Sequence, residues 1–384
     1  MYTKKTLVLS VIVSILIGTF VAVSSIGYVV SKATGTSTYG MGKILAALTI
    51  LQTRYINDLS PDAIVHNTIK GIASSTNDPH TAYIYGEAYK RLMSETKGEF
   101  GGIGSLIGEK DGLPVIVSPI DDSPSIAAGV KAGDKILKVD NHEIKKGTPI
   151  DEVVDKIRGP KDTKVTILFL SEDGNTREIT ITRDIIKNKT VSTKMLKDDI
   201  GYIRIGQFSE NTPTDFNKAL KELDDKGVTK LVLDLRMDPG GSLQACVEIA
   251  KQLVPKGMIV YTIDKSGQKQ EFLSNLEKPK YKLAVLVDKG SASASEILAG
   301  AIQDTKSGIL IGTKTYGKGS VQALIPLDSS SAFKVTIAKY YTPSGRSIDG
   351  IGIEPDIVIE LDEKNIKTSD NQIEKAKEEL EKAS

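Results

Sequence analysis

Three serines occupy alternate positions in the stretch DKGSASASEILAG, residues 288–300. The apolar run KLAVLVD before them predicts a buried strand, and SEILAGAIQD predicts a helix, so the serines lie on the turn between the two. A turn from strand to helix exposes its side chains, and the free backbone N–H groups where a helix begins can stabilise an oxyanion. The pattern therefore suits a serine nucleophile in acyl transfer.

Ser293 is the best placed of the three hydroxyls. With Glu296 it forms the S-x-x-E pattern of a helix capping box. Local sequence leaves two interpretations open, because the same geometry serves a helix cap and a nucleophile. Ser291 and Ser295 lack a capping partner and are weaker candidates, and the alanines beside Ser293 leave the approach to its hydroxyl unobstructed.

A serine nucleophile needs a base to take its proton. The chain has only three histidines, His66, His80 and His142, and all three are poorly placed for this role. We therefore expect a lysine to be the base, as in the Ser-Lys variant of this chemistry, provided that burial lowers its pKa toward neutrality. Lys318, in GTKTYGKGSVQALI, lies between two glycines and before an apolar strand, and is the best candidate.

The sequence gives little support for a phosphate-binding loop or a metal site. Residues 312–318, GTKTYGK, match the start of a phosphate-binding loop, but Gly319 stands where that motif needs Ser or Thr, and a strand follows where it needs a helix. No spacing typical of a metal site occurs, and the single cysteine, Cys246, lies in an apolar helical pattern that predicts a core residue. We expect neither a metal nor any other cofactor.

The composition argues against a nucleic-acid partner. Across 384 residues, Lys plus Arg (50) balances Asp plus Glu (49), whereas proteins that hold nucleic acid usually show a clear basic excess. Aromatic side chains make up only 5% of the chain, too few for a stacking platform for single strands. The hydrophobic fraction of 40% and the length are enough for several folded domains.

The N-terminus carries an uncharged segment at residues 6–31, directly after Lys4 and Lys5. About 20 apolar residues span a bilayer, whereas the core of a secretory signal peptide is usually about 7–15 residues long. The length favours a retained signal-anchor, with the N-terminus in the cytoplasm and the remainder extracytoplasmic. Small residues near Ala22 and Ser24 leave cleavage open, and a cleaved protein would be secreted.

After the N-terminal segment at residues 1–36, the pattern of apolar and turn-forming residues divides the chain into three regions. Residues 37–96 are predicted to be helical, with a turn at NDPHTAYI. Residues 97–187 hold four short β-branched runs and two short helical pieces, which is typical of a small β-barrel-like domain. From residue 188 to 384, strands and helices alternate, which predicts a mixed α/β core.

The tail SDNQIEKAKEELEKA predicts a surface helix. Ser369 and Gln372 form the pattern of a capping box at its start. Its thin apolar stripe leaves a homodimer contact open.

Several of these segments together resemble a known family. SASASEILAGAIQD, GTKTYGKGSVQALIPL, AKYYTPSGRSIDGIGIEPD and LVLDLRMDPGGSL are similar to motifs of the carboxy-terminal processing proteases, also called tail-specific proteases, of peptidase family S41. NDPHTAYI and FGGIG resemble the family's DPHS turn and the entry to its PDZ domain. The resemblance implies a multidomain α/β protein with a PDZ domain and a peptidase core of the ClpP/crotonase type.

The resemblance also implies roles for the residues of the serine and lysine motifs. Ser293 would be the nucleophile, Lys318 the base, and Gln322 the support of that lysine. Residues 318 and 322 are an even number apart, so on a strand they would point to the same face, which fits a Gln322 side chain bonded to the lysine amine. The chain departs from the family near the serine turn, where Asp288 stands in place of the usual asparagine.

In the family, two backbone N–H groups form the oxyanion hole. Here they would come from Ala294 and from one of the glycines Gly240 and Gly241. The family usually has Asn-Asn before Pro-Gly-Gly, whereas this chain has Met237 and Asp238. These departures leave the catalytic side chains in place and affect the finer geometry of the oxyanion loop.

The PDZ resemblance gives residues 97–187 a function. Gly102, Ile103 and Gly104 correspond to the carboxylate-binding loop, whose N–H groups receive the C-terminus of a peptide that adds as a strand. Arg158 resembles a family arginine at the junction between the PDZ domain and the protease, although a plain surface arginine is nearly as good an interpretation.

The sequence thus predicts a membrane-anchored, extracytoplasmic serine endopeptidase with a Ser-Lys dyad. Its partners would be proteins or peptides with exposed C-terminal tails, bound through the PDZ domain. The alternative is a non-catalytic PDZ scaffold that only binds C-termini. The presence of Ser293, Lys318 and Gln322 together argues against a scaffold, which has no need of all three.

Overall fold

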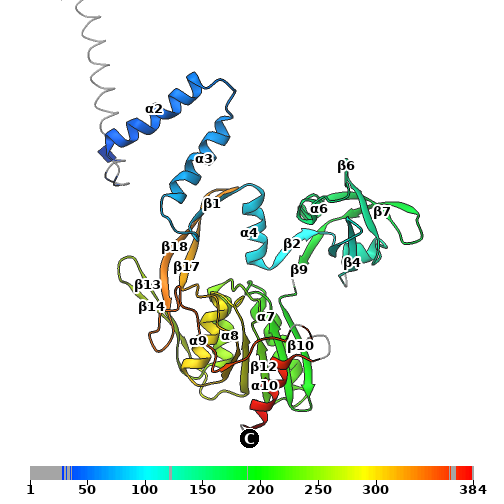
Figure 1. Cartoon of the computed structure of the whole chain (residues 1–384), viewed down its shortest axis with the longest axis vertical. Helices are drawn as coiled ribbons and strands as arrows, with labels where there is room; N and C mark the ends of the chain where they lie inside the picture. The colour runs from blue at the N-terminus through cyan, green and yellow to red at the C-terminus, as the bar shows by residue number, and fades with distance from the viewer. Residues whose placement is uncertain are drawn as a thin grey trace, which may run out of the picture. The chain divides into compact units, whose positions relative to one another are not determined.

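The computed structural model of the chain divides into two compact units, residues 1–75 and residues 76–384 (Figure 1). The residues described are 37–120, 123–187, 189–362 and 369–382, with the single residues 28, 29, 32, 35 and 364. The first unit holds the helices α2 (Thr38–Arg54) and α3 (Pro61–Ser74). Each begins after a serine whose hydroxyl accepts a backbone N–H of the first turn, which explains where the helices start.

The predicted membrane segment at residues 6–31 lies outside the described residues, apart from Tyr28 and Val29. Within the part of the chain that is described, no helix combines the length and the apolar character needed to cross a membrane.

The four strands and two helices predicted between residues 97 and 187 are all present. The elements of this β domain are β2 (Glu99–Gly102), β3 (Ser105–Lys110), β4 (Leu113–Pro119), α5 (Pro124–Ala127), β5 (Lys135–Val139), β6 (His142–Glu143), α6 (Ile150–Ile157), β7 (Lys164–Leu170), β8 (Thr176–Thr182) and β9 (Asp184–Lys187). Its main sheet has the order β3-β4-β5-β7-β8, and β2 pairs separately with β9. Ile116, Ile136 and Phe169 are fully buried in its core.

The predicted mixed α/β core follows. Its elements are β10 (Val191–Lys197), β11 (Ile200–Ile205), α7 (Thr212–Asp224), β12 (Lys230–Asp234), α8 (Leu243–Leu253), β13 (Gly257–Asp264), β14 (Lys269–Ser274), β15 (Lys282–Val287), α9 (Ala294–Asp304), β16 (Ile309–Gly312), β17 (Ser320–Asp328), β18 (Ser331–Tyr341), β19 (Ile357–Val358) and α10 (Asn371–Lys382). One sheet has the order β10-β11-β12-β15-β16-β19, and its strands from β11 onward run parallel.

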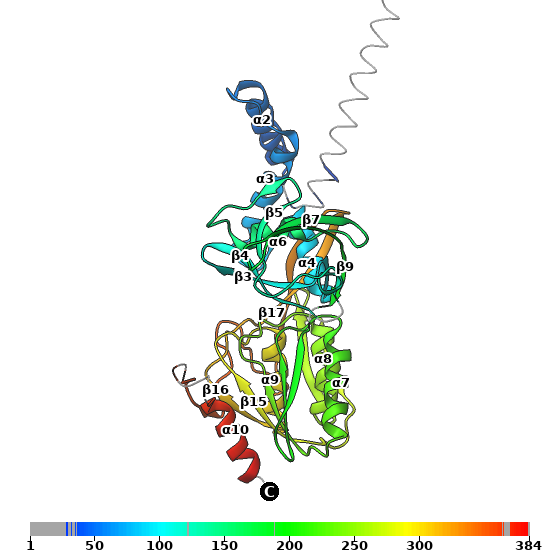
Figure 2. The same cartoon turned by 90° about the vertical axis from the view of Figure 1, so that its right-hand side faces the viewer.

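Helices cover both faces of this parallel sheet (Figure 2). Successive side chains of a strand point to opposite faces. Ile203 and Leu233 accordingly pack with α7, α8 and α9, whereas Tyr202 and Val232 pack with α10. Burial on both faces explains why these strands read as nearly continuous apolar runs in the sequence.

The stretch expected to be only a turn contains a strand. Residues 82–85 form β1 (Ala82–Tyr85), which pairs antiparallel with β18, and α4 (Glu87–Lys97) follows it. A strand of four residues carries little local pattern, and its partner lies far along the chain, so the sequence around it does not reveal it. The second sheet has the order β1-β18-β13-β14, with β17 also paired to β18.

The tail helix α10 packs on its own chain. Its apolar residues Ile373, Ala376 and Leu380 are buried against the parallel sheet, so this stripe is not available for the homodimer contact considered from the sequence. The predicted cap is also wrong: the helix begins at Asn371, and Asp370 Oδ1 accepts the N–H groups of residues 372 and 373. A carboxylate in this position also suits the positive end of the helix dipole.

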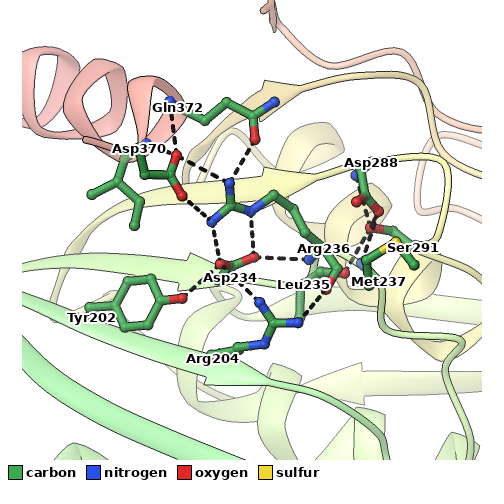
Figure 3. Close-up of polar contacts among 11 residues, drawn as sticks. Tyr202, Arg204, Asp234, Leu235, Arg236, Met237, Asp288, Ser291, Asp370 and Gln372 are labelled. Atoms are coloured by element: carbon green, nitrogen blue, oxygen red, sulfur yellow. Dashed lines mark hydrogen bonds and ion pairs between the residues drawn. The ribbon is translucent and has the colours of Figure 1, made fainter. Parts of the chain in front are cut away.

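Arg236, at the end of β12, fixes α10 to the sheet (Figure 3). Its buried guanidinium donates to Asp234 Oδ2 (2.6 Å), Asp370 Oδ2 (2.9 Å) and Gln372 Oε1 (2.8 Å). Asp234 also accepts from the Tyr202 hydroxyl at 2.7 Å. Removing one partner of such a buried network typically costs about 3–5 kcal/mol, because the other charge stays buried and unpaired.

Candidate active site

Three loops that follow neighbouring parallel strands build the site. The loop after β12 carries Gly240 and Gly241, the loop after β15 carries Ser293, and the loop after β16 carries Lys318. In open α/β sheets, ligands bind at the carboxyl ends of the strands, where such loops gather. The order of the strands, β12-β15-β16, therefore brings together motifs that are far apart in the sequence.

Of the three serines, only Ser293 lines the cavity beside these loops. Ser291 and Ser295 are fully buried, and their hydroxyls donate to the backbone carbonyls of Leu235 (2.8 Å) and Asp238 (3.0 Å). Ser293 is half-buried and precedes α9 with φ 54° and ψ −113°, a conformation that L-residues rarely adopt. Such backbone strain costs on the order of 1–3 kcal/mol and clusters at functional sites.

A cavity of about 530 Å³ brings the predicted residues together. All of the residues named from the serine, lysine and oxyanion motifs line it: Ser293, Lys318, Gln322, Ala294, Gly240 and Gly241. Leu92 of α4, Phe208, Leu243 and Leu324 add apolar surface to its wall. The arrangement offers room for an extended peptide segment beside the serine and the lysine.

The carboxylate of Glu296 connects the serine loop to the lysine loop. It is fully buried, and its Oε2 accepts the backbone N–H groups of Ser293 and Lys318, both at 2.9 Å. Its Oε1 accepts from the Thr315 hydroxyl (2.6 Å) and the Gly317 N–H (2.7 Å). The capping box visible in the sequence is thus one part of a larger network that fixes the two loops to each other.

Tyr340 makes a second connection between the same two residues. Its hydroxyl lies at 3.2 Å from the Ser293 carbonyl oxygen and also contacts the carbonyl oxygen of Lys318. Burial raises the pKa of Tyr340 well above its ordinary value, so the hydroxyl keeps its proton for donation. Neither Tyr340 nor the reach of Glu296 to Lys318 was expected from the sequence. The motif AKYYTPSGRSIDG contains Tyr340, but nothing local says that it points into the site.

Lys318 has the environment that a base requires. Burial lowers the pKa of Lys318, the nearby charge of Lys334 lowers it further, and Glu296 and Asp78 act in the opposite direction. Among the described residues, the amine makes no ion pair. A lysine with a lowered pKa loses its proton more readily, as acceptance of a serine proton demands.

Gln322 lines the cavity but is not bonded to the lysine. Its Nε2 donates to the Ser320 hydroxyl (2.9 Å) and lies 3.4 Å from the Thr336 hydroxyl. The described side chains include no hydrogen bond between Gln322 and Lys318, contrary to the expected contact. β17 begins at Ser320, so Lys318 lies before the strand, and the alternation assumed from the sequence does not extend to it.

Gly240 packs directly against the serine turn. A Cβ at this position would lie 2.5 Å from the Ala292 carbonyl oxygen and 2.7 Å from the Ala294 nitrogen, and φ is 91°, so only glycine fits. The N–H of Gly240 donates to Asp238 Oδ1 at 2.8 Å. No described residue accepts from the N–H of Gly241 or of Ala294, which leaves both free for an oxyanion.

The predicted peptide loop of the β domain lies between β2 and β3. Ile103 is buried in the domain core, and the carbonyl oxygen of Gly104 accepts from the hydroxyls of Ser123 (2.9 Å) and Ser125 (2.7 Å). Gly104 has φ 74° and no space for a side chain. Because β3 is an edge strand of its sheet, a peptide could add beside it from this loop onward.

Arg158 follows α6 and packs on the strand that leads into the peptide loop. Its guanidinium lies 4.6 Å from the centre of the Phe100 ring, and its Nε is buried without a hydrogen-bond partner. Gly159 donates to the Gly101 carbonyl oxygen at 3.2 Å. On the same helix, Asp155 pairs with Arg91 of α4 at 2.8 Å, so α6 and α4 are connected.

Comparisons with known proteins agree with these motifs. A model of peptidase family S41 matches residues 199–359, and a PDZ domain model matches residues 115–171. A carboxy-terminal-processing protease of Bartonella bacilliformis is 43% identical over 325 residues, which cover 81% of this chain and 73% of that protein. The chain belongs to peptidase family S41.

Other relatives extend the match. A carboxy-terminal processing protease of Bacillus subtilis is 37% identical over 326 residues, which cover 83% of this chain and 68% of that protein. The solved structure of a photosystem II D1 C-terminal processing protease is similar with a TM-score of 0.51 and 29% identity, covering 88% of this chain and 92% of that one. The chain is a serine-type carboxy-terminal processing peptidase with a PDZ domain, which confirms the predicted class.

The departures from the S41 motifs lie around the oxyanion loop. Met237 has φ 58°, a conformation that asparagine adopts more readily than methionine. Asp288 Oδ1 accepts the N–H of Met237 at 2.9 Å (Figure 3). It also accepts the N–H of Gly290 at 2.9 Å. An asparagine oxygen could accept the same bonds, so this exchange preserves the local hydrogen bonding.

Asp238, which stands where the family usually has asparagine, changes the electrostatics of this loop. It is fully buried, its Oδ2 has no hydrogen-bond partner among the described residues, and burial raises its pKa to about 7. The Gly240 N–H and Arg204 act in the opposite direction. Cys246, a buried core residue as predicted, lies close enough for the charge of Asp238 to raise its pKa further. Burial thus gives the loop that carries Gly240 and Gly241 a carboxyl group with a raised pKa.

We predict that Asp238→Asn makes the protein more stable than the wild type above pH 7, with a difference that grows between about pH 4 and pH 7. In this range the folded Asp238 keeps a proton that the unfolded chain, with an ordinary value of 3.8, has lost. The free energy of unfolding of the wild type therefore falls as pH rises, by about 1.4 kcal/mol for each unit between the two values. Urea unfolding of both proteins from pH 4 to pH 8 measures it. A difference that does not change with pH would show that Asp238 ionises normally.

Proposed function

We propose that this S41 peptidase cleaves peptide bonds with a dyad of Ser293 and Lys318. The observation that carries the proposal is the convergence of a strained, accessible serine and a partly buried lysine on one cavity, joined through Glu296. The lowered pKa of Lys318 supports its role as the base. The free N–H groups of Ala294 and Gly241 support their role as the oxyanion hole, with Gly241 favoured because Gly240 already donates to Asp238.

The chemistry follows from these positions. The neutral amine of Lys318 takes the Ser293 hydroxyl proton while Oγ attacks the peptide carbonyl carbon, and the two N–H groups bind the resulting oxyanion. Collapse of the intermediate breaks the C–N bond, and the proton on Lys318 passes to the leaving amine. A water molecule, deprotonated in turn by Lys318, then attacks the carbonyl carbon of the acyl-serine ester. The C–Oγ bond breaks, the proton on Lys318 returns to Ser293 Oγ, and the new C-terminus is released.

We predict that Lys318→Arg is as inactive as Ser293→Ala, with losses on the order of a thousandfold or more. Arginine keeps the positive charge and most of the length but cannot release its proton. Cleavage of an unstructured protein by residues 37–384 measures the effect, and circular dichroism confirms folding. Wild-type kcat/KM should rise with pH, because only the deprotonated form of Lys318 can accept the serine proton. The lowered pKa of Lys318 moves this rise to a lower pH than an ordinary lysine would give. Near-normal cleavage by Lys318→Arg would rule out the dyad.

Gln322→Ala should be milder than Lys318→Arg, because Gln322 touches the cavity without contacting the lysine. A wild type that binds C-terminal peptides but cleaves nothing under varied conditions would instead favour the non-catalytic PDZ scaffold.

We further propose that the PDZ domain binds substrate C-termini through Gly102, Ile103 and Gly104, with the peptide beside β3. Arg158 would transmit peptide binding to the protease. It directly follows α6, and its guanidinium packs on Phe100 of β2, the strand that leads into this loop. The buried Nε of Arg158 without a partner is consistent with a residue that changes its contacts when a peptide binds.

We predict that a peptide with an apolar last residue binds more tightly as the free acid than as the C-terminal amide. The amide removes the charge that the N–H groups of the loop would receive. Fluorescence anisotropy with Ser293→Ala gives both dissociation constants, and Arg158→Ala should leave them unchanged while altering cleavage of tailed substrates. Equal affinity for acid and amide would contradict the assignment of the loop.

The uncharged segment at residues 6–31 supports a further proposal, that it anchors the protein in the membrane with residues 37–384 extracytoplasmic. We predict that the full-length protein fractionates with membranes and resists carbonate extraction. Mass spectrometry of the mature N-terminus provides the second measurement, and a chain that begins near residue 25 would mean that the segment is a cleaved signal.

A further inference from the structure

A second lysine, Lys334, lines the same cavity as Ser293 and Lys318. It lies on β18, directly opposite Leu324 of β17. Of the residues of β17, Ser320, Val321, Gln322 and Leu324 also line the cavity. The sheet therefore presents Lys334 on the catalytic face.

Lys334 has no counter-ion in the described part of the chain. The residue is half-buried, and its amine makes no ion pair and no hydrogen bond there. Lys339, on the same strand, is more exposed and pairs with Asp349 at 3.1 Å. Partial withdrawal of a charge from water costs free energy unless a partner compensates it. The stability of the fold therefore does not explain an unpaired lysine in this cavity.

The remaining ionisable groups around Lys318 are engaged elsewhere or uncharged. Glu296, on α9, already accepts four hydrogen bonds, and Asp78, before β1, accepts from the His80 N–H (2.9 Å) and the Thr81 hydroxyl (2.7 Å). Tyr340, on β18, is held neutral by burial.

Glu95, on α4, is exposed and also lines the cavity. Of the groups whose charges bear on Lys318, Lys334 alone carries the same sign.

We propose that Lys334 acts through Lys318: its unpaired ammonium, held in the same cavity, disfavours a second positive charge there and keeps the Lys318 amine in its neutral, proton-accepting form. This inference rests on the proposed function, because it requires Lys318 to be the base. Lys334 thus acts on the reaction only through its charge and does not touch the reacting atoms. Burial is the larger cause of the lowered pKa of Lys318.

The test is the pH dependence of kcat/KM for the wild type, Lys334→Met and Lys334→Arg. Methionine removes the charge and keeps most of the stem, so the rising part of the profile should move to higher pH while the high-pH plateau stays near the wild-type value. Below both midpoints, each unit of this displacement lowers activity about tenfold. Arginine keeps the charge and should keep the wild-type midpoint. Lys334→Gln is a second neutral variant if Lys334→Met does not fold.

Lys339→Met is the matched control, because it removes a lysine from the same strand outside the cavity. It should leave the midpoint unchanged. An unchanged midpoint in Lys334→Met would overturn the inference, whether kcat is lowered equally at every pH or only KM is raised. The second of these results would indicate that Lys334 binds the substrate instead.

Labelling with acetic anhydride separates this inference from the dyad itself. In a Ser293→Ala background, mass spectrometry follows the modification of Lys318 against pH without any need for catalysis. The midpoint should rise when Lys334→Met is added, and an unmoved midpoint would overturn the inference. If Lys318→Arg stays active, the proposed dyad fails; if Lys318→Arg is inactive and both midpoints of Lys334→Met are unmoved, only the role of Lys334 fails.

Discussion

The active site depends on one buried carboxylate. Glu296 accepts the backbone N–H groups of Ser293 and Lys318 with a single oxygen, so the two loops cannot shift relative to each other without breaking a hydrogen bond to a charged acceptor. Four donors satisfy this carboxylate, which offsets the cost of burying it. The Glu296 carboxylate holds both residues by their backbones and not by the Ser293 hydroxyl or the Lys318 amine, and Tyr340 adds a second connection at their carbonyl oxygens.

The parallel sheet makes this arrangement possible. β12, β15 and β16 are neighbours, so the loops that follow them meet at one edge although their residues are widely separated in the chain. The loop after β12 and the serine turn lie in direct contact, which explains the small residues where they meet. Gly240 abuts Ala292 and Ala294, and side chains at these positions would separate the oxyanion loop from the serine turn.

Much of this could be predicted from the sequence. Local patterns predicted the strand and helix around Ser293, and the scarcity of histidine directed attention to lysine. Contacts between distant segments could not be predicted in the same way. The connection from Glu296 to Lys318, the orientation of Tyr340 and the pairing of β1 with β18 all depend on the assembled sheets. The family resemblance implied that Gln322 supports Lys318, whereas its side chain donates to Ser320 and Thr336 of the assembled sheet.

The same dependence on distant residues has a consequence for biosynthesis. Arg236 stands at the base of the oxyanion loop, and its partner Asp370 lies 134 residues further along the chain. A ribosome makes residues in order, so the arginine is complete long before the carboxylate and the helix that cover it. Of the three side chains that accept from this guanidinium, only Asp234 precedes it in the chain. The loop that carries Gly240 and Gly241 is therefore synthesised long before the residues around 370 that bind the arginine at its start, and this support is complete only after they have been made.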